Sequence, residues 1–269
     1  MPVDVHAEVL SNVRLSADYN VLTMAAPEIG ELTQPGQFVM VKAFPMIDSL
    51  LRRPFSVFEI IRESRRVRAI SILNKRAGRN TRALYDVEPG SRVACLGPLG
   101  RSFTTEPGMQ AWLVAGGVGL APFATLAESL TAAGVTTTLF YGARTAAELF
   151  YIEFFERLGV SLVLATEDGS RGIRGRVTAP LQEALARLDG PGSAMVYACG
   201  PEAMLEAVAR LAARYDQPSE VSVERVMGCG LGGCYSCVIP VRHGTTSHYV
   251  RSCIGGPVFA GADIAWERC

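Results

Sequence analysis

The sequence predicts an antiparallel β-barrel, then a doubly wound α/β domain, then a small irregular C-terminal segment. Closely spaced strand patterns fill the chain as far as Phe103, and strand and helix patterns alternate after about Thr104. The last part follows neither pattern and carries four cysteines among glycines. We therefore expect divisions at residues 1–103, 104–223 and 224–269, because 269 residues suffice for two domains and an appendage.

Six short stretches of the first part are rich in branched residues and are separated by Gly, Pro, Asn or charged turns. Strands that follow one another without helices are typical of an antiparallel barrel. The expected strands are Val3–Leu10, Val13–Ser16, Tyr19–Met24, Gln37–Ala43, Ser56–Arg62 and Arg66–Leu73.

Strands and helices alternate in the second part, which indicates a mostly parallel, doubly wound sheet. The expected strands are Ala111–Ala115, Thr136–Gly142, Ser161–Ala165, Ala194–Ala198 and Glu220–Val223. The expected helices are Ala121–Ala133, Ala146–Leu158, Thr178–Leu188 and Glu202–Tyr215.

Composition excludes several classes of partner. Lys+Arg 26 equals Asp+Glu 26, so no charged field attracts nucleic acid or an anionic membrane. The longest apolar stretch, Ala111 to Ala127, is shorter than the roughly 20 residues that a membrane span requires. The N-terminus lacks the basic and apolar regions of a signal peptide. Since four of the seven cysteines look like ligands, we expect a reducing cytoplasm.

The four cysteines of the C-terminal segment have the spacing of a plant-type [2Fe–2S] site. Cys229, Cys234 and Cys237 read C-x4-C-x2-C, and Cys253 follows after fifteen residues. Thiolates are soft donors that suit iron–sulfide, and the glycines between them let the backbone approach a cluster. A structural zinc site is the alternative, but it usually shows two C-x2-C pairs and this chain has one.

A glycine-rich turn follows the first strand of the second part and leads into a helix. Gly117 and Gly119 allow a phosphate to approach closely, and Pro122 suits the first helical turn. A tight structural turn is the alternative. Later strand ends would meet the same ligand, because ligands gather at the carboxyl ends of a doubly wound sheet. They supply Gly142, Arg144, Asp168, Cys199, Gly200 and Pro201.

The segment Arg52–Ser56 opens a barrel strand and suits a flavin. An Arg fork can grip a pyrophosphate, and a Ser farther along the strand can hydrogen-bond the edge of a flavin ring. Because side chains alternate along a strand, only one of the two arginines can turn to the pyrophosphate, and we choose Arg53.

R-P-x-S at this place resembles the flavin motif of the ferredoxin–NADP reductase superfamily, and G-G-x-G-x-x-P and C-G-P at 116–122 and 199–201 resemble its nicotinamide motifs. The resemblance implies a six-stranded barrel for FAD, followed by a nucleotide-binding domain with Cys199 beside the nicotinamide. Phe55 stands where Tyr is common, and Asn80 stands where Gly is usual. The implied FAD contacts are Arg53, Pro54, Phe55, Ser56, Leu73, Asn74, Lys75, Gly78, Asn80 and Thr81.

The tail resembles one family closely, the electron-transfer subunit of type B dihydroorotate dehydrogenase. Its motifs E-x-x-M-x-C-G-x-G-x-C-x-x-C and C-x-D-G-P-V-F match residues 224–237 and 253–259, with Gly255 in place of the Asp. The resemblance implies FAD, one [2Fe–2S] cluster and NAD, and a heterotetramer with an FMN subunit that oxidises dihydroorotate in pyrimidine biosynthesis. Electrons would then pass from the partner's flavin through the cluster and FAD to NAD+.

Three alternatives remain open at the level of the sequence. The chain could serve another complex, such as a ferredoxin–NAD(P) transhydrogenase or a sulfide dehydrogenase. It could be a self-contained NAD(P)H-dependent reductase with a soluble acceptor, or a non-enzymatic, zinc-stabilised nucleotide-binding module. NAD and NADP are also both open, because Arg144 could meet a 2′-phosphate.

Overall fold

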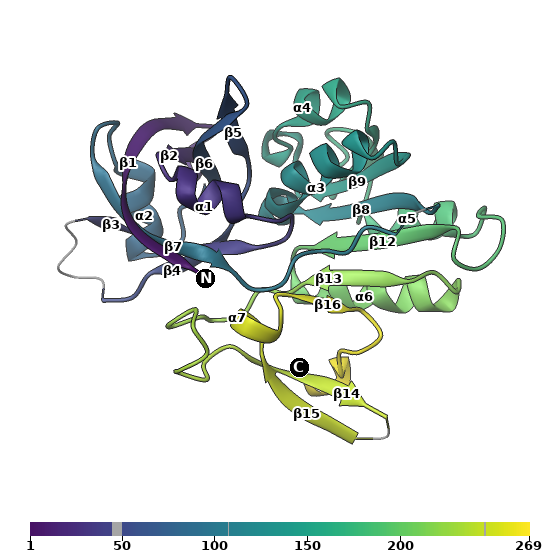
Figure 1. The fold of residues 1–269 in the computed structure, drawn as a ribbon. Helices are drawn as coiled ribbons and strands as arrows, with labels where there is room; N and C mark the ends of the chain where they lie inside the picture. Colours follow the sequence, from purple (N-terminus) through teal and green to yellow (C-terminus); the bar gives the residue numbers. More distant parts are fainter. Residues whose placement is uncertain (45–49, 107, 245) are drawn as a thin grey trace.

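The computed structural model describes residues 1–44, 50–106, 108–244 and 246–269. The chain forms three parts, with a curled sheet on one side, an α/β domain on the other, and the C-terminal segment below both (Figure 1). Within the described residues, no helix combines the length and apolar character needed to cross a membrane.

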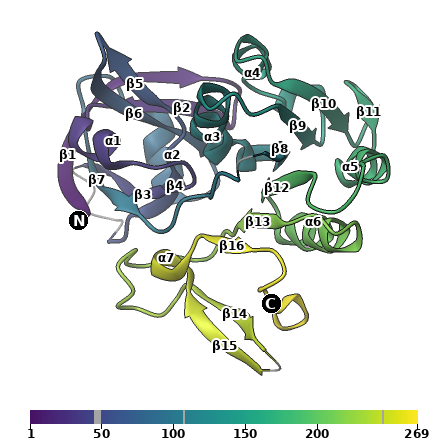
Figure 2. The same ribbon diagram turned by 45° about the vertical axis from the view of Figure 1, so that its right-hand side comes forward.

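The first part is an antiparallel sheet, as predicted, with seven strands in the order β4-β3-β7-β1-β2-β6-β5. It curls around a core to which most of the strands contribute (Figure 2). The helix α2 (Arg79–Asp86) follows β6 and packs against β2, β3 and β6. The strands are β1 (Val3–Arg14), β2 (Tyr19–Met24), β3 (Phe38–Phe44), β4 (Arg53–Ser56), β5 (Ile60–Glu63), β6 (Arg66–Lys75) and β7 (Arg92–Leu99).

Three details differ from the six expected strands. The first two are one strand, β1, because a bulge between Val9 and Ser11 lets pairing with β2 continue past the irregularity. The expected strand at 56–62 is divided between β4 and β5, which pair with different neighbours. The strand β7 was missed, and it lies between β3 and β1.

The second part is doubly wound, as predicted. Its sheet has the order β11-β10-β9-β8-β12-β13-β16, and the strands from β8 to β13 are parallel. Two apolar clusters cover its two faces. The strands are β8 (Gln110–Gly116), β9 (Thr137–Ala143), β10 (Ser161–Thr166), β11 (Ile173–Arg174), β12 (Ala194–Cys199) and β13 (Ser219–Ser222). The helices are α3 (Ala121–Ala132), α4 (Ile152–Arg157), α5 (Thr178–Leu185) and α6 (Glu202–Arg214).

The two parts share one apolar core. Val21, Phe58 and Leu73 of the curled sheet belong to the same buried cluster as Phe123 and Tyr141 of the α/β domain. The Tyr197 hydroxyl donates to the Thr104 carbonyl oxygen at 2.7 Å, where the chain passes from one part to the other. The two parts are therefore packed against each other rather than loosely linked.

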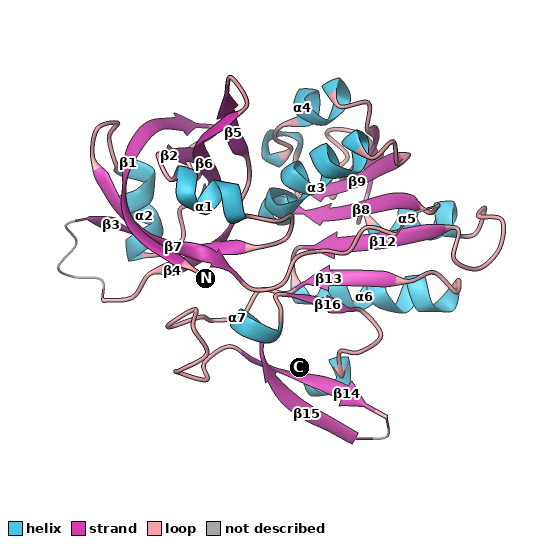
Figure 3. Cartoon of the chain, in the orientation of Figure 1, coloured by secondary structure: helices cyan, strands magenta, loops and turns pink. Residues whose placement is uncertain are grey.

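The C-terminal segment contains more regular structure than expected (Figure 3). The strands β14 (Val238–His243) and β15 (Thr246–Arg251) pair with each other, and α7 (Ser252–Gly255) follows. The strand β16 (Val258–Ala260) then pairs antiparallel with β13 at the edge of the α/β sheet. The residues around the first three cysteines, before β14, are irregular as predicted.

Candidate functional site

A cleft of about 660 Å³ opens at the carboxyl ends of the parallel strands. The strand β8 pairs with β9 on one side and with β12 on the other. The chain runs outward from β8 to β11 and then crosses back to begin β12, so the strand order reverses at β8. Such a switch point leaves a crevice in doubly wound sheets, where nucleotides commonly bind. Five of the predicted nicotinamide-site residues line the cleft: Gly117, Gly142, Arg144, Gly200 and Pro201.

Two of the predicted residues support the cleft from behind. Gly119 is buried, and a Cβ there would lie 2.1 Å from the Cys199 carbonyl oxygen, so only Gly lets the turn pack on β12. Pro122 is buried in the first turn of α3. Gly117 faces open space, where a phosphate can approach.

Cys199 and Asp168 are not among the described residues that line the cleft. Cys199 is 3% exposed at the end of β12, and burial raises the pKa of its thiol. Asp168 turns back to Ser170, whose hydroxyl and backbone N–H donate to its carboxylate at 2.6 and 2.9 Å. These bonds lower the pKa of Asp168, and its neighbour Glu167 lines the cleft instead.

Residues from the other two parts complete the cleft. Tyr19 and Lys75 come from the curled sheet, and Glu224 begins the C-terminal segment. The Lys75 ammonium lies 5.3 Å from the centre of the Tyr19 ring. Glu224 is solvent-accessible in the open cleft, yet desolvation by the surrounding protein raises its pKa, and Lys75 partly offsets this. No sequence motif indicates this convergence, which depends on how the three parts pack.

The predicted flavin segment is the edge strand β4, paired with β3. Its two arginines differ in their partners. The Arg52 guanidinium forms an ion pair with Asp4 on β1 at 2.6 Å. The Arg53 guanidinium is exposed, and its hydrogen bonds go to the nearby carbonyl oxygens of Leu51 and Arg52 at 3.4 and 3.2 Å. Arg53 is therefore the arginine that is available to a pyrophosphate.

The start of α2 has the features of an anion site. A Cβ on Gly78 would meet nothing within 4 Å, and the first N–H groups of a helix have no intrahelical partner. The Asn80 amide donates to the Val41 carbonyl oxygen on β3 at 2.9 Å. The side-chain oxygens of Asn80 and Asn74 are buried and find no hydrogen-bond partner among the residues that the structure describes. FAD carries both the phosphates and the donor groups that such a site would accept.

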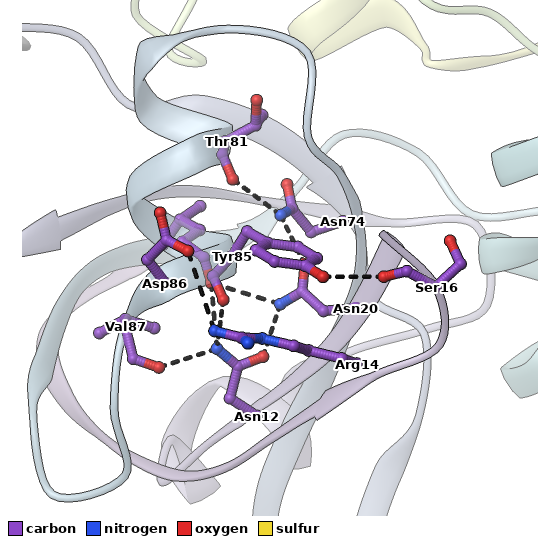
Figure 4. A network of polar contacts seen from close by, with 10 residues as sticks. Asn12, Arg14, Ser16, Asn20, Asn74, Thr81, Tyr85, Asp86 and Val87 are labelled. Carbon is purple, nitrogen blue, oxygen red and sulfur yellow. Dashed lines mark hydrogen bonds and ion pairs between the residues drawn. The ribbon is translucent and has the colours of Figure 1, made fainter. Parts of the chain in front are cut away.

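A chain of asparagine side chains holds α2 in place (Figure 4). Asn74 donates to the Asn20 side-chain oxygen at 2.7 Å and to the Thr81 carbonyl oxygen at 2.9 Å. Asn20 donates to the Asn12 side-chain oxygen at 2.7 Å, and Asn12 donates to the Val87 carbonyl oxygen beyond α2 at 2.8 Å. The network ties both ends of the helix to β1, β2 and β6.

The four cysteines lie close enough to one another for Cys229 and Cys237 to shift the pKa of Cys234 and Cys253. Hydrogen bonds from Ser236 and Cys229 lower the pKa of Cys234 to about 6, while burial and the neighbouring Cys237 raise the pKa of Cys253 to about 12. Among the described residues, no group of three or more His, Cys, Asp or Glu side chains is arranged around one metal ion. The C-x4-C-x2-C spacing with a distant fourth cysteine is typical of a [2Fe–2S] cluster, whereas a Zn(Cys)4 site usually shows two C-x2-C pairs.

The cysteine loop, residues 228–237, packs on the curled sheet, and the C-terminal segment that contains it also reaches the α/β sheet through β16. Cys237 and Cys253 are buried in one cluster with Phe38 and Met40 of β3 and with Leu96 and Leu99 of β7. Gly230 has φ +72°, and a Cβ there would lie 2.7 Å from Met40, so Gly is required for this approach. The C-terminal segment therefore contacts both of the other parts of the chain.

Comparison with known proteins identifies related domains in the same parts of the chain. The family model of the iron–sulfur cluster binding domain of dihydroorotate dehydrogenase B matches residues 224–265, and that of the oxidoreductase NAD-binding domain matches residues 113–210. A protein of Desulforamulus reducens, named dihydroorotate dehydrogenase B (NAD(+)), electron transfer subunit, is 36% identical over 262 residues, which cover 97% of this chain and 98% of that protein. A protein of Bacillus caldolyticus with the same name is 39% identical over 247 residues, 90% of this chain and 91% of that protein.

A solved structure also matches almost the whole chain. It is an NADH-dependent reduced ferredoxin-NADP oxidoreductase, studied for flavin-based electron bifurcation, with a TM-score of 0.84 and 26% identity. The match covers 98% of this chain and 91% of that one. A ferredoxin reductase of carbazole 1,9a-dioxygenase, with a TM-score of 0.67 and 22% identity over 80% of this chain and 66% of that one, shares the fold.

Proposed function

The chain belongs to the family of electron transfer subunits of dihydroorotate dehydrogenase B, and we propose that it passes electrons from a catalytic partner to NAD+ through a [2Fe–2S] cluster and FAD. One observation carries the proposal. The cysteine loop packs on Phe38 and Met40 of β3, and the same two residues pair with Ser56 and Pro54 of the flavin segment. The cluster and flavin sites therefore share one wall of the sheet.

Different groups of residues bind FAD, the dinucleotide and the cluster. FAD, when bound, supplies the exchange between single electrons and the electron pair of nicotinamide. Arg53 and the first turn of α2 hold its pyrophosphate, and Ser56 hydrogen-bonds the ring edge. The turn at Gly117 and the Gly200–Pro201 corner receive the dinucleotide, and Cys237 and Cys253 keep one side of the cluster away from water.

We further propose that the partner contains FMN, oxidises dihydroorotate in pyrimidine biosynthesis, and forms a heterotetramer with this chain in the cytoplasm. The surface beside the cysteines supports docking there. Val226, Leu231, Tyr235 and Ile254 are large apolar side chains that are between 46% and 80% exposed. Clusters of exposed apolar side chains commonly mark protein interfaces.

The test compares the complex with a variant that lacks the cluster. The isolated chain should reduce artificial dyes with NADH and should not oxidise dihydroorotate. Cys234→Ser in the complex should stop dihydroorotate-to-NAD+ electron flow and spare NADH-to-dye transfer, which needs only FAD. Cys269→Ser, a change at an exposed cysteine outside the loop, is the control and should alter neither rate. A Cys234→Ser complex that still supports the full reaction would refute the proposed route.

The similarity to the ferredoxin-NADP oxidoreductase favours one alternative, electron exchange with ferredoxin. Reduced ferredoxin offered to the purified chain with NAD+ distinguishes the two. Rapid NADH formation without any partner subunit would favour the alternative, and its absence would favour the dihydroorotate complex.

A further inference from the structure

The cleft has two chemically different ends along the sheet. Glu224, which begins the cysteine-bearing segment, borders it beside Gly200 and Pro201 at the end of β12. The redox end of a dinucleotide belongs there, next to the route that the electrons take. Across β8 the cleft is bordered by the ends of β9 and β10 and by Arg176 in front of α5 (Figure 2). The adenosine ribose of an extended dinucleotide therefore lies at the β9–β10 end.

Arg144 stands at that end, but its hydrogen-bonding edge is already in use. Its Nε donates to one carboxylate oxygen of Glu148 at 3.2 Å, and its Nη2 donates to the other. The Arg144 backbone N–H also donates to the Glu148 carboxylate, at 3.3 Å. This is the two-point pairing with which a guanidinium would otherwise grip a phosphate.

Glu148 is the fixed member of the pair. The hydroxyl of the buried Tyr141 donates to its carbonyl oxygen at 3.1 Å, and its side chain is 19% exposed against 70% for Arg144. Hydrogen bonding to Arg144 lowers the pKa of Glu148, and the positive charge of Lys75 adds to this, so the carboxylate stays ionised. An incoming phosphate would have to break the hydrogen bonds between Arg144 and Glu148, because Tyr141 holds Glu148 in place.

A second carboxylate borders the same end. Glu167 lines the cleft, and its backbone N–H donates to the Ala143 carbonyl oxygen at 3.1 Å, next to Arg144. A ribose 2′-hydroxyl can donate to a carboxylate, whereas a 2′-phosphate brings about −1.5 to −2 charges toward it.

We propose that the Arg144–Glu148 ion pair is a selectivity device, which withholds the guanidinium from a 2′-phosphate and so favours NAD over NADP. This rests on the proposed function of the cleft as the dinucleotide site. Arg176 also lines the cleft and makes no ion pair among the described residues. It serves the pyrophosphate that both dinucleotides share, and therefore does not discriminate between them.

The test measures binding of ADP-ribose and of its 2′-phosphate by calorimetry on the FAD-loaded full chain, so that no turnover is needed. Wild type should prefer ADP-ribose. Glu148→Gln keeps the shape of the side chain and should shift the affinity ratio toward the 2′-phosphate by about tenfold, the scale of one hydrogen bond to a charged group. Adding Arg144→Gln should reverse that shift, and Arg176→Gln should weaken both ligands equally.

Glu183→Gln is the matched control, because Glu183 also pairs with an arginine four residues on, Arg187, but on the exposed side of α5. It should leave the ratio unchanged. An unchanged ratio in Glu148→Gln, a shift that survives Arg144→Gln, or a selective loss in Arg176→Gln would each overturn the inference. Failure of wild type to bind ADP-ribose at all would instead refute the proposed function of the cleft.

Discussion

The backbone N–H of Arg101 donates to the carbonyl oxygen of Gly256 at 2.6 Å. Arg101 lies where the chain leaves the curled sheet, and Gly256 follows α7, the helix that carries Cys253. The bond joins the wall of the flavin sheet to the cysteine segment directly. We therefore expect loss of the cluster to disturb the contact between Arg101 and Gly256. The flavin site is built from other residues, those of β4 and α2.

The first prediction concerns the content of the purified protein. It should be yellow-brown and hold FAD with two irons and two acid-labile sulfides per chain, since the four cysteines have the spacing of a [2Fe–2S] site. Cys234→Ser should remove the cluster and leave much of the FAD. Metal analysis and released-flavin fluorescence measure both. One equivalent of zinc without labile sulfide would contradict the assignment of the cluster.

Arg53→Ala should lower FAD occupancy more than Arg52→Ala. The Arg53 guanidinium is exposed on the flavin strand, whereas Arg52 is already paired with Asp4. The Arg52 change should instead cost the fraction of a kcal/mol typical of a partly exposed ion pair, roughly 0.2–1 kcal/mol. Flavin retained after gel filtration and urea unfolding separate the two effects. Equal retention in both variants would show that the wrong arginine was chosen.

Asn74→Ala should loosen α2. The change leaves the buried Asn20 side-chain oxygen and the Thr81 carbonyl oxygen without their donor. We expect a loss of about 1–3 kcal/mol in the free energy of unfolding, the usual cost of unsatisfied buried groups, and faster FAD release. Gln182→Ala, on the exposed face of α5, should change neither quantity. Unaltered FAD release despite the lower stability would show that the network does not position the flavin helix.

Glu59→Gln should stabilise the protein at neutral pH. Burial raises the pKa of Glu59 although Ser71 donates to it at 2.8 Å, and burial together with Glu59 raises the pKa of Glu128 on α3. A raised pKa means that ionisation of Glu59 lowers the free energy of unfolding. Replacing the carboxyl group by an uncharged amide therefore stabilises the protein above the pKa of the folded state. It should disappear below the ordinary value of 4.5, where the carboxyl is protonated in both states.

We expect a rise in melting temperature of about 1–2 °C at pH 7.5, the scale of a fraction of a kcal/mol in a chain of this size. Glu63→Gln, an exposed change at the end of β5, which begins directly after Glu59, serves as the control. The same rise at pH 4 would mean that something other than the charge of Glu59 is responsible.

Local pattern predicted the alternating strands and helices of the α/β domain well, because each element there carries its own signal. It failed where tertiary context overrides a local signal. Gly97 and Pro98 are residue types that favour turns, yet they lie within β7, whose other residues are almost all buried between β3 and β1. Pro240 has no N–H to donate, yet it lies within β14, where it pairs with Tyr249 and its carbonyl oxygen accepts from the Ala265 N–H at 3.0 Å.

The candidate sites also divide into features that the sequence predicts and features that depend on tertiary packing. The cysteine spacing and the glycine turn are contiguous in sequence, so their chemistry could be predicted. That Arg144 is engaged by Glu148, and that Tyr19 and Glu224 border the nucleotide cleft, depends on side-chain partners and on packing between parts. No periodicity encodes such contacts.

The pairing of β16 with β13 has a consequence for how the chain tolerates truncation. A bare sheet edge offers unpaired backbone groups to any other extended chain, and proteins protect such edges with very short strands or covering segments. The strand β16 is only three residues long, and it covers the edge of β13. Deletion of the cysteine segment would thus uncover a template for intermolecular strand addition, and the remaining flavin and nucleotide parts would self-associate instead of forming a smaller soluble reductase.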